Sequence, residues 1–279
     1  MPSLGCDQIQ DLLEYNQIYR ELAATAIPRP TLPCFIFVGY ILMGSNSRNA
    51  VPGGLTTVGA KMLVAITGIA LILFVIAHML GNLQFHLGAE ALDSYAKKLK
   101  DMGPLLWVAR IGLLAVFVTH VGLTLVLTRR NSQARGTLAS TEPQIRATGE
   151  RYVNGYDYET ATTASRFMVH TGLLILLFVI YHLMHFTIMP DPSIAHGKVH
   201  QMVQSGFQAP LTSAIYILAQ LMLASHIYHG ASSSLQTLGL RTDSTKAGVS
   251  KLGILVAIIV AVGNISIPAA VLAGWVPTS

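Results

Sequence analysis

Seven histidines lie inside long apolar stretches of this 279-residue chain. In chain order they are His78, His120, His170, His182, His185, His226 and His229. An ionisable side chain in such surroundings is costly and marks a functional hypothesis. These stretches contain no Asp or Glu, which a proton relay through histidines would usually include. Neutral imidazole is the commonest metal ligand and a usual axial ligand of haem iron, so the pattern favours ligation.

The elements that carry these histidines are predicted to be membrane-spanning helices. The chain is 52% hydrophobic and only 11% charged, whereas soluble domains carry about 25% charged residues. Five stretches are long and apolar enough to cross about 30 Å of hydrocarbon as helices. They cover residues 62–84, 105–128, 167–189, 211–236 and 252–275. The sequence therefore predicts an all-α membrane protein with five transmembrane helices.

The charge of the loops predicts how these helices are oriented. Arg and Lys concentrate before the first span, between the second and third, and between the fourth and fifth. The other two loops and the C-terminal tail are poorer in them. Because short cytoplasmic loops carry an excess of Lys and Arg, we expect a cytoplasmic N-terminus and an external C-terminus.

Residues 1–56 are predicted to be an irregular extension that precedes a membrane domain at 57–279. Its apolar run, residues 34–43, is too short to span a bilayer. This run has three interpretations: a signal-peptide core, an interfacial segment, or residues upstream of a true start at Met43. The polar stretch before the run is long and carries few positive charges, which disfavours the signal peptide. The third interpretation is favoured.

The histidines fall at two depths when helix rise is counted at 1.5 Å per residue. His78 and His182 lie about 17 and 16 residues from the inner ends of their spans, level with each other towards the outside. His120 and His229 each lie about 8 residues from the inner ends of theirs. Two such pairs, about 13 Å apart in height, suit two stacked haems in a four-helix bundle formed by the first four spans.

The first and third spans share a Thr-Gly pair that precedes a histidine. Thr67 lies eleven residues before His78, and Thr171 lies eleven residues before His182. Eleven residues place both side chains on nearly the same helix face, about 16 Å apart. The pair therefore lies at the depth of the inner haem, and we expect these small residues to leave room for it.

Two neighbouring histidines leave the choice of ligands open. His185 and His226 each lie three residues from a candidate ligand, on nearly the same face. Either one is an alternative ligand, or a hydrogen-bond donor to a haem propionate or a quinone. The plainer interpretation of a single membrane histidine is a hydrogen bond between helices. That interpretation loses weight for four histidines that match in pairs by depth, but it is sufficient for His170 near the inner interface.

Four segments carry a family resemblance. They read TGIALILFVIAHMLGNLQFHLGAEALDSYAKKL, AVFVTHVGLTL, SRFMVHTGLLILLFVIYHLMHFT and YHGASSSLQTLGL. Together they resemble the cytochrome b membrane subunit of bacterial succinate dehydrogenases and fumarate reductases, of the type with five helices and two b haems. The resemblance covers about residues 57–240.

This resemblance implies a set of haem ligands. In that family the first and third helices ligate the outer haem, and the second and fourth ligate the inner one. The implied pairs are His78 with His182, and His120 with His229. The Thr-Gly spacing selects His182 over its neighbour His185. The His-Gly dipeptide of the fourth span likewise selects His229 over His226.

The resemblance also implies partners and a path for electrons. A flavoprotein and an iron–sulfur protein would dock on the cytoplasmic face of the bacterial cytoplasmic membrane and oxidise succinate there, so this chain would not itself act on succinate. Electrons would pass through the inner and outer haems to a quinone, expected to be menaquinone, and no nucleic acid is involved. Candidate quinone ligands are Asn82, Gln84 and His86 at the end of the first span, and His200 in the next outer loop.

One departure from the family bears on direction. Some fumarate reductases of this type carry a glutamate two residues before the fourth-helix ligand, where this chain has Ile227. This favours a succinate dehydrogenase over a fumarate reductase anchor that runs in reverse. Two other classes remain as alternatives, namely the cytochrome b anchor of another quinone-linked dehydrogenase and a haem-free transporter that uses histidines.

Overall fold

A computed structural model describes residues 50–51, 55–134, 167–188 and 193–276. The chain divides into two compact units, Met1–Gly59 and Ala60–Ser279. The apolar run at 34–43, the candidate start at Met43 and most of the Arg-rich loop between the second and third spans lie outside the described residues.

The described part of the first unit is a short antiparallel ribbon. Strand β1 (Ala50–Val51) pairs with β2 (Leu55–Thr56), with Ala50 opposite Thr56. The sequence analysis treated this stretch as irregular. The ribbon leads directly into the first helix, because the hydroxyl of Thr56 accepts the backbone N–H of Gly59 at 2.9 Å. This is the hydrogen bond of an N-cap residue, and it determines where the helix begins.

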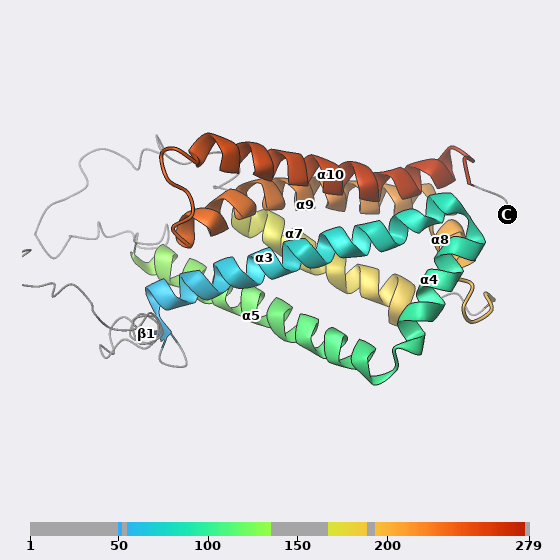
Figure 1. The fold of residues 1–279 in the computed structure, drawn as a ribbon, viewed down its shortest axis with the longest axis horizontal. Helices are drawn as coiled ribbons and strands as arrows, with labels where there is room; N and C mark the ends of the chain where they lie inside the picture. Colours follow the sequence, from blue (N-terminus) through green and yellow to red (C-terminus); the bar gives the residue numbers. More distant parts are fainter. Residues whose placement is uncertain (1–49, 52–54, 135–166, 189–192, 277–279) are drawn as a thin grey trace, which may run out of the picture. The chain divides into compact units, whose positions relative to one another are not determined.

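Five long helices follow, and Figure 1 shows them running side by side. They are α3 (Thr57–Asn82), α5 (Pro104–Ala134), α7 (Met168–Leu183), α9 (Pro210–Thr237) and α10 (Lys246–Leu272). A 3-10 turn (Leu83–Leu87) extends α3, and a π-helical turn (Met184–Ile188) extends α7. Each of the five is long and apolar enough to cross a membrane, which confirms the predicted number of spans for the described part of the chain.

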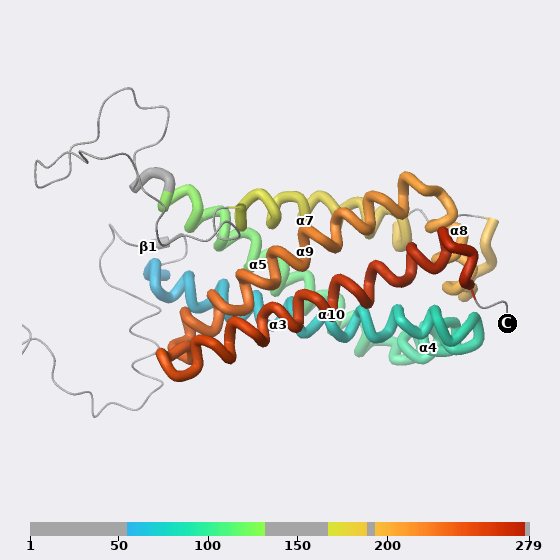
Figure 2. Tube along the Cα trace, turned by 90° about the horizontal axis from the view of Figure 1, so that it is seen from above, coloured from blue at the N-terminus to red at the C-terminus, as the bar shows by residue number. Residues whose placement is uncertain are grey.

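Two of the spanning helices, α9 and α10, lie in close contact along their lengths, and α7 packs on the other side of α9 (Figures 1 and 2). Gly253 of α10 allows the close approach, since a Cβ there would lie 3.2 Å from the carbonyl oxygen of Tyr228. Nearby, Ile227 of α9 is buried with Val260 of α10. Apolar side chains of α3 pack against this cluster, so α10 joins α3 to α9.

Two shorter helices, α4 (Ala89–Asp101) and α8 (Val199–Gln208), lie at one end of the spans, here called the α4–α8 end. The sequence analysis treated both stretches as loops. Asp93 of α4 joins them, because its Oδ1 accepts the backbone N–H of His200 at 2.9 Å in the first turn of α8. Lys198, at the N-cap position of α8, forms no side-chain cap, so Asp93 caps α8 from another helix.

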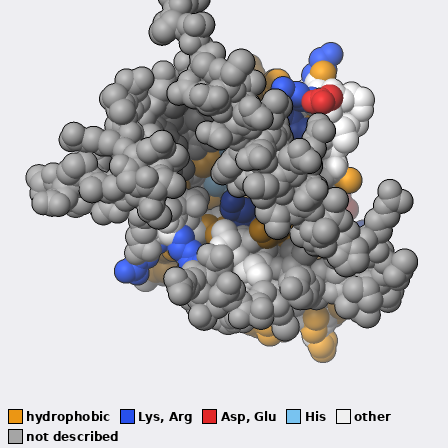
Figure 3. Space-filling view, turned by 90° about the vertical axis from the view of Figure 1, so that its left-hand side faces the viewer, with side chains coloured by type: hydrophobic (Ala, Val, Ile, Leu, Met, Phe, Trp, Pro, Cys, Tyr) orange, Lys and Arg blue, Asp and Glu red, His pale blue; other side chains and the backbone are white. Residues whose placement is uncertain are grey.

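The opposite end of the spans is rich in basic side chains, and Figure 3 looks onto it. The described Lys and Arg residues there are Lys61, Arg129, Arg130, Arg241, Lys246 and Lys251. Asp243 is the one acid at this end among the residues that the structure describes. The α4–α8 end is mixed, with acids and lysines on α4. This asymmetry is the one used above to predict orientation.

Replacing Asp93 with alanine removes the acceptor that caps α8. Losing such a cap costs about 1 kcal/mol. We therefore expect a lower midpoint of thermal unfolding for the detergent-solubilised protein, and faster amide hydrogen exchange in the first turn of α8. Asp93→Asn keeps a side-chain oxygen as acceptor, so its unfolding midpoint and exchange rate should lie between those of the wild type and Asp93→Ala. Unchanged exchange in Asp93→Ala would contradict the cap.

Candidate functional site

The histidines of α3 and α7 that were predicted to be level do lie together. The ring centroids of His78 and His182 are 5.9 Å apart, with the ring planes at 85°. Phe74, one turn earlier on α3, stacks on His78 at 5.5 Å and restrains its ring. The depth counted along two separate helices therefore corresponds to a contact in space.

Tyr216 of α9 forms hydrogen bonds with the two histidines near the end of α7. Its hydroxyl lies 3.3 Å from Nδ1 of His182 and 3.1 Å from Nδ1 of His185. A phenol carries one proton, so it donates to one of these nitrogens and accepts from the other. Engaging Nδ1 of His182 leaves its Nε2 available for another partner.

His185 occupies different surroundings from His182. Its ring lies 4.1 Å from that of Phe186, and its Cε1 would be 3.1 Å from a Cβ at Gly206 of α8. Among the described residues, His78 makes ring contacts with Phe74 and His182 but none with His185. The structure thus brings His182 to His78 and turns His185 toward α8.

A second arrangement joins α3 to α5 at the level of the first Thr-Gly pair. Oγ1 of Thr67 lies 3.1 Å from Nδ1 of His120. A Cβ added to Gly68 would lie 3.2 Å from Cε1 of the same ring, which is tighter than ordinary contact. The hydroxyl thus holds one edge of the imidazole, and the missing side chain lets the ring approach the helix.

The same arrangement recurs between α7 and α9. Oγ1 of Thr171 lies 3.2 Å from Nδ1 of His226, and a Cβ at Gly172 would lie 3.3 Å from Cε1 of that ring. We call each Thr-Gly pair with its histidine ring a Thr-Gly seat. The two seats join residues separated by 53 and 55 positions in the chain. This near-equal spacing between threonine and histidine in the sequence is a pattern from which both contacts could have been predicted.

The seats change the interpretation of the Thr-Gly pairs. From the spacing, each pair was expected to leave space for a haem. In the structure, a histidine ring from the next span lies beside each glycine. The ring in the second seat is His226, which the sequence analysis made its second choice. His229 is half-buried, and its ring has no hydrogen bond among the described residues. His226 is close enough to interact electrostatically with both His120 and His229.

The remaining intramembrane histidine, His170, lies apart from these groups. It stands near the beginning of α7 with an exposed side chain, and its ring is tilted against that of Phe167 at 5.9 Å. This position agrees with the plain interfacial role expected for it.

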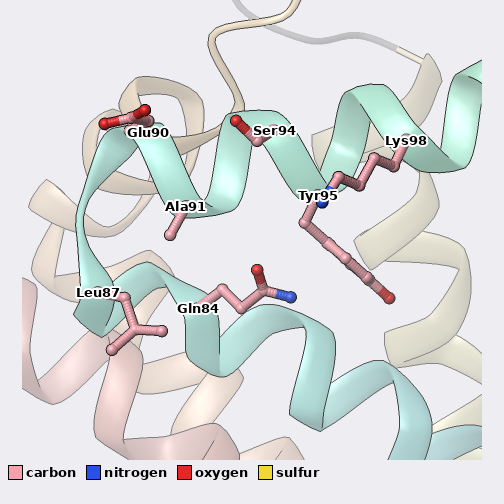
Figure 4. A pocket seen from close by; sticks show the side chains of 7 residues that line it. All are labelled: Gln84, Leu87, Glu90, Ala91, Ser94, Tyr95 and Lys98. Carbon is pink, nitrogen blue, oxygen red and sulfur yellow. The ribbon is translucent and has the colours of Figure 1, made fainter.

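The candidate quinone ligands do not converge on one point. Gln84 lines a cavity of about 530 Å³ beneath α4. In Figure 4 the side chains of Gln84 and Tyr95 extend into the space between the two helical segments. His86 instead bonds Ser266 of α10, with Nε2 2.9 Å from Oγ. Asn82 is half-buried and does not line the cavity.

His200 is a further candidate that the structure places away from the cavity. It is buried, and its ring stacks on Phe85 at 4.6 Å. Its Nε2 is buried with no hydrogen-bond partner among the described residues. Of the four candidates, Gln84 is therefore the one that faces a cavity large enough for a small molecule.

The separation of His78 and His182 fits two imidazoles that share one metal ion. A metal–imidazole bond is about 2 Å long, so two axial nitrogens on opposite sides of an ion lie about 4 Å apart. The ring centres then lie about 6 Å apart, which matches the observed 5.9 Å. No group of three or more metal-ligating side chains occurs in the described part of the chain. A donor set of two imidazoles suits haem, where the porphyrin supplies the remaining ligands.

One known family matches part of the chain. Residues 151–265 match the family model of the succinate dehydrogenase/fumarate reductase transmembrane subunit. This region of the chain is similar to that family. The matched region holds α7, α9 and most of α10, and thus His182 and the second Thr-Gly seat. No curated protein and no solved structure matched the chain. Five of the described helices are long and apolar enough to cross a membrane, which agrees with the transmembrane subunit that the matched region resembles.

A large side chain at Gly68 should disturb the first seat. Gly68→Leu would push carbon atoms into the ring of His120 and toward Ser234, whose Oγ would be 3.5 Å from a Cβ there. Overpacking of this kind typically costs about 1–3 kcal/mol. We expect a lower midpoint of thermal unfolding in detergent. Gly112→Leu is the control, because a Cβ at Gly112 meets nothing within 4 Å. Equal midpoints for the two variants would contradict the tight seat.

Proposed function

We propose that this chain is the dihaem cytochrome b anchor of a succinate dehydrogenase. In this role it carries electrons from an iron–sulfur subunit on the cytoplasmic face, through two b haems, to a membrane quinone. The observation that carries the proposal is the meeting of His78 and His182 at 5.9 Å in a transmembrane subunit of this family. Imidazoles at that spacing can share one metal ion, and haem iron is the ion that the family resemblance favours.

The outer haem is proposed to lie between α3 and α7, with His78 and His182 as its axial ligands. Tyr216 supports this assignment, because its hydroxyl can accept Nδ1–H of His182 while donating its own proton to Nδ1 of His185, which leaves the lone pair of His182 Nε2 for the iron. His185 is less suited, since its ring lies against Phe186 and α8.

The inner haem is proposed to lie between α5 and α9, with His120 as one ligand. For the second ligand, the contacts favour His226, whose ring is held in the same way as that of His120. The sequence resemblance instead selects His229, which stays the alternative. The repeated seat supports His226, since equivalent ligands of one haem are expected to be held by equivalent groups.

Two b haems bound in this way supply one-electron redox centres with no open coordination position. The chain's own residues hold the axial imidazoles, fix their tautomers and exclude water.

The orientation and partners are proposed from charge. The basic end of the spans would face the cytoplasm, where the flavoprotein and iron–sulfur subunits dock. The α4–α8 end would then face outward in a bacterial cytoplasmic membrane. Quinone, with menaquinone as the expected type, would bind at this end, and the cavity beside Gln84 is the favoured place. The direction favoured by Ile227 is succinate oxidation.

The first test is a haem count. We expect the purified protein to yield two haems b per chain by pyridine haemochrome, and none would point to a haem-free function such as transport. His182→Ala should lose one haem, because no other imidazole meets His78. His170→Ala is the matched control and should keep both. If His182→Ala also keeps both, the proposed outer ligand is wrong.

The second test separates the two candidates for the inner ligand. His226→Ala should lose one haem, whereas His229→Ala should keep both, because the ring of His229 has no Thr-Gly seat. The reverse result would assign the ligand to His229, as the resemblance selects. Reduced-minus-oxidised spectra of both variants, prepared in parallel, give the measurement.

A further inference from the structure

We infer that Thr67 and Thr171 are positioning residues for the inner haem. Each threonine hydroxyl accepts a hydrogen bond from Nδ1–H of a histidine in the next span, which presents Nε2 of that ring for ligation. This inference rests on the proposed function, and it adds two residues that touch neither iron nor quinone.

The direction of the hydrogen bond follows from the other contacts of Thr67. Its Oγ1 lies 2.7 Å from the carbonyl oxygen of Leu63 in the preceding turn. A carbonyl can only accept, so the single hydroxyl proton is directed to that oxygen. The oxygen of Thr67 is then left to accept, and its partner at 3.1 Å is Nδ1 of His120. A neutral imidazole that donates from Nδ1 keeps a free lone pair on Nε2.

Thr171 repeats this geometry with different neighbours. Its Oγ1 lies 3.1 Å from the carbonyl oxygen of Met168 and 3.2 Å from that of Phe167. The third contact, at 3.2 Å, is Nδ1 of His226. Two carbonyl acceptors again take the hydroxyl proton, so Nδ1 of His226 is the donor. Thr67 has the same pair of contacts, since its Oγ1 also lies 3.2 Å from the carbonyl oxygen of Val64. The same bonding to the preceding turn therefore gives both histidines the same tautomer.

Burial makes these hydrogen bonds necessary. The side chains of Thr67 and Thr171 are 9% and 7% exposed; Thr67 lies inside α3, and Thr171 lies in the first turn of α7. In hydrocarbon, an imidazole N–H without an acceptor costs several kcal/mol by transfer scales. The glycine beside each threonine lets the ring come close enough for the bond, as the 3.2 and 3.3 Å Cβ distances indicate.

An acceptor on Nδ1–H also changes how strongly Nε2 donates to a metal. Hydrogen bonding at the far nitrogen fixes the tautomer and raises the basicity of the ligand. A more basic axial ligand favours the ferric state and lowers the reduction potential of the haem. The two seats are therefore expected to hold the inner haem at a lower potential than unsupported histidines would.

The experiment replaces each hydroxyl with a methyl group of similar shape. Thr67→Val and Thr171→Val are compared with Thr124→Val in redox titrations of the purified complex, followed at the b-haem bands. Thr124 is the matched control, because its hydroxyl bonds the backbone carbonyls of His120 and Val121 at 2.8 Å and, among the described residues, forms no hydrogen bond with an imidazole nitrogen. We expect an upward shift in the midpoint potential of one haem in each seat variant. The other haem, and both haems of Thr124→Val, should keep their wild-type potentials.

Each remaining outcome decides the inference. Wild-type potentials in both seat variants, or equal shifts of both haems, would overturn it. If a valine variant loses a haem, Thr67→Ser and Thr171→Ser decide, since serine restores the hydroxyl. Recovery of that haem by serine supports the inference, and continued loss overturns it. Failure of the proposed function is distinct, because the wild-type protein would then contain no haem.

Discussion

In the apolar interior of a membrane, every polar group needs a partner, and this constraint shapes the structure. Helices satisfy the backbone groups within each span. The imidazoles need hydroxyl groups from neighbouring helices. Thr67 forms a hydrogen bond with His120, and Thr171 forms one with His226. Tyr216 bonds both His182 and His185. Each of these bonds engages Nδ1 of the imidazole, so Nε2 is the nitrogen left for another partner.

Because each hydroxyl lies on a different helix from its histidine, the same bonds set the helix pairs. The first seat joins α3 to α5, and the second joins α7 to α9. The meeting of His78 and His182 joins α3 to α7 toward the α4–α8 end. Helix α10 has no histidine and contributes apolar packing against α9, which Gly253 permits.

Several of these features could be predicted from residue types and spacing, and others could not. Composition was sufficient for the five spans, and helix rise was sufficient to place His78 level with His182. The helices α4 and α8 were missed because short, partly charged stretches between spans have the composition of loops. Their pairing depends on Asp93 meeting the backbone of His200, 107 positions away. A contact of that separation leaves no local pattern in the chain.

Apolar length and helix rise predict histidines at two depths in the spans, because both are properties of each helix alone. Which of two histidines three residues apart meets a neighbour depends on contacts between helices. His182 and His185, like His226 and His229, share one helix face to within a fraction of a turn. Their roles are separated by contacts that other helices provide. Tyr216 and His78 meet at His182, and the Thr171–Gly172 pair receives His226.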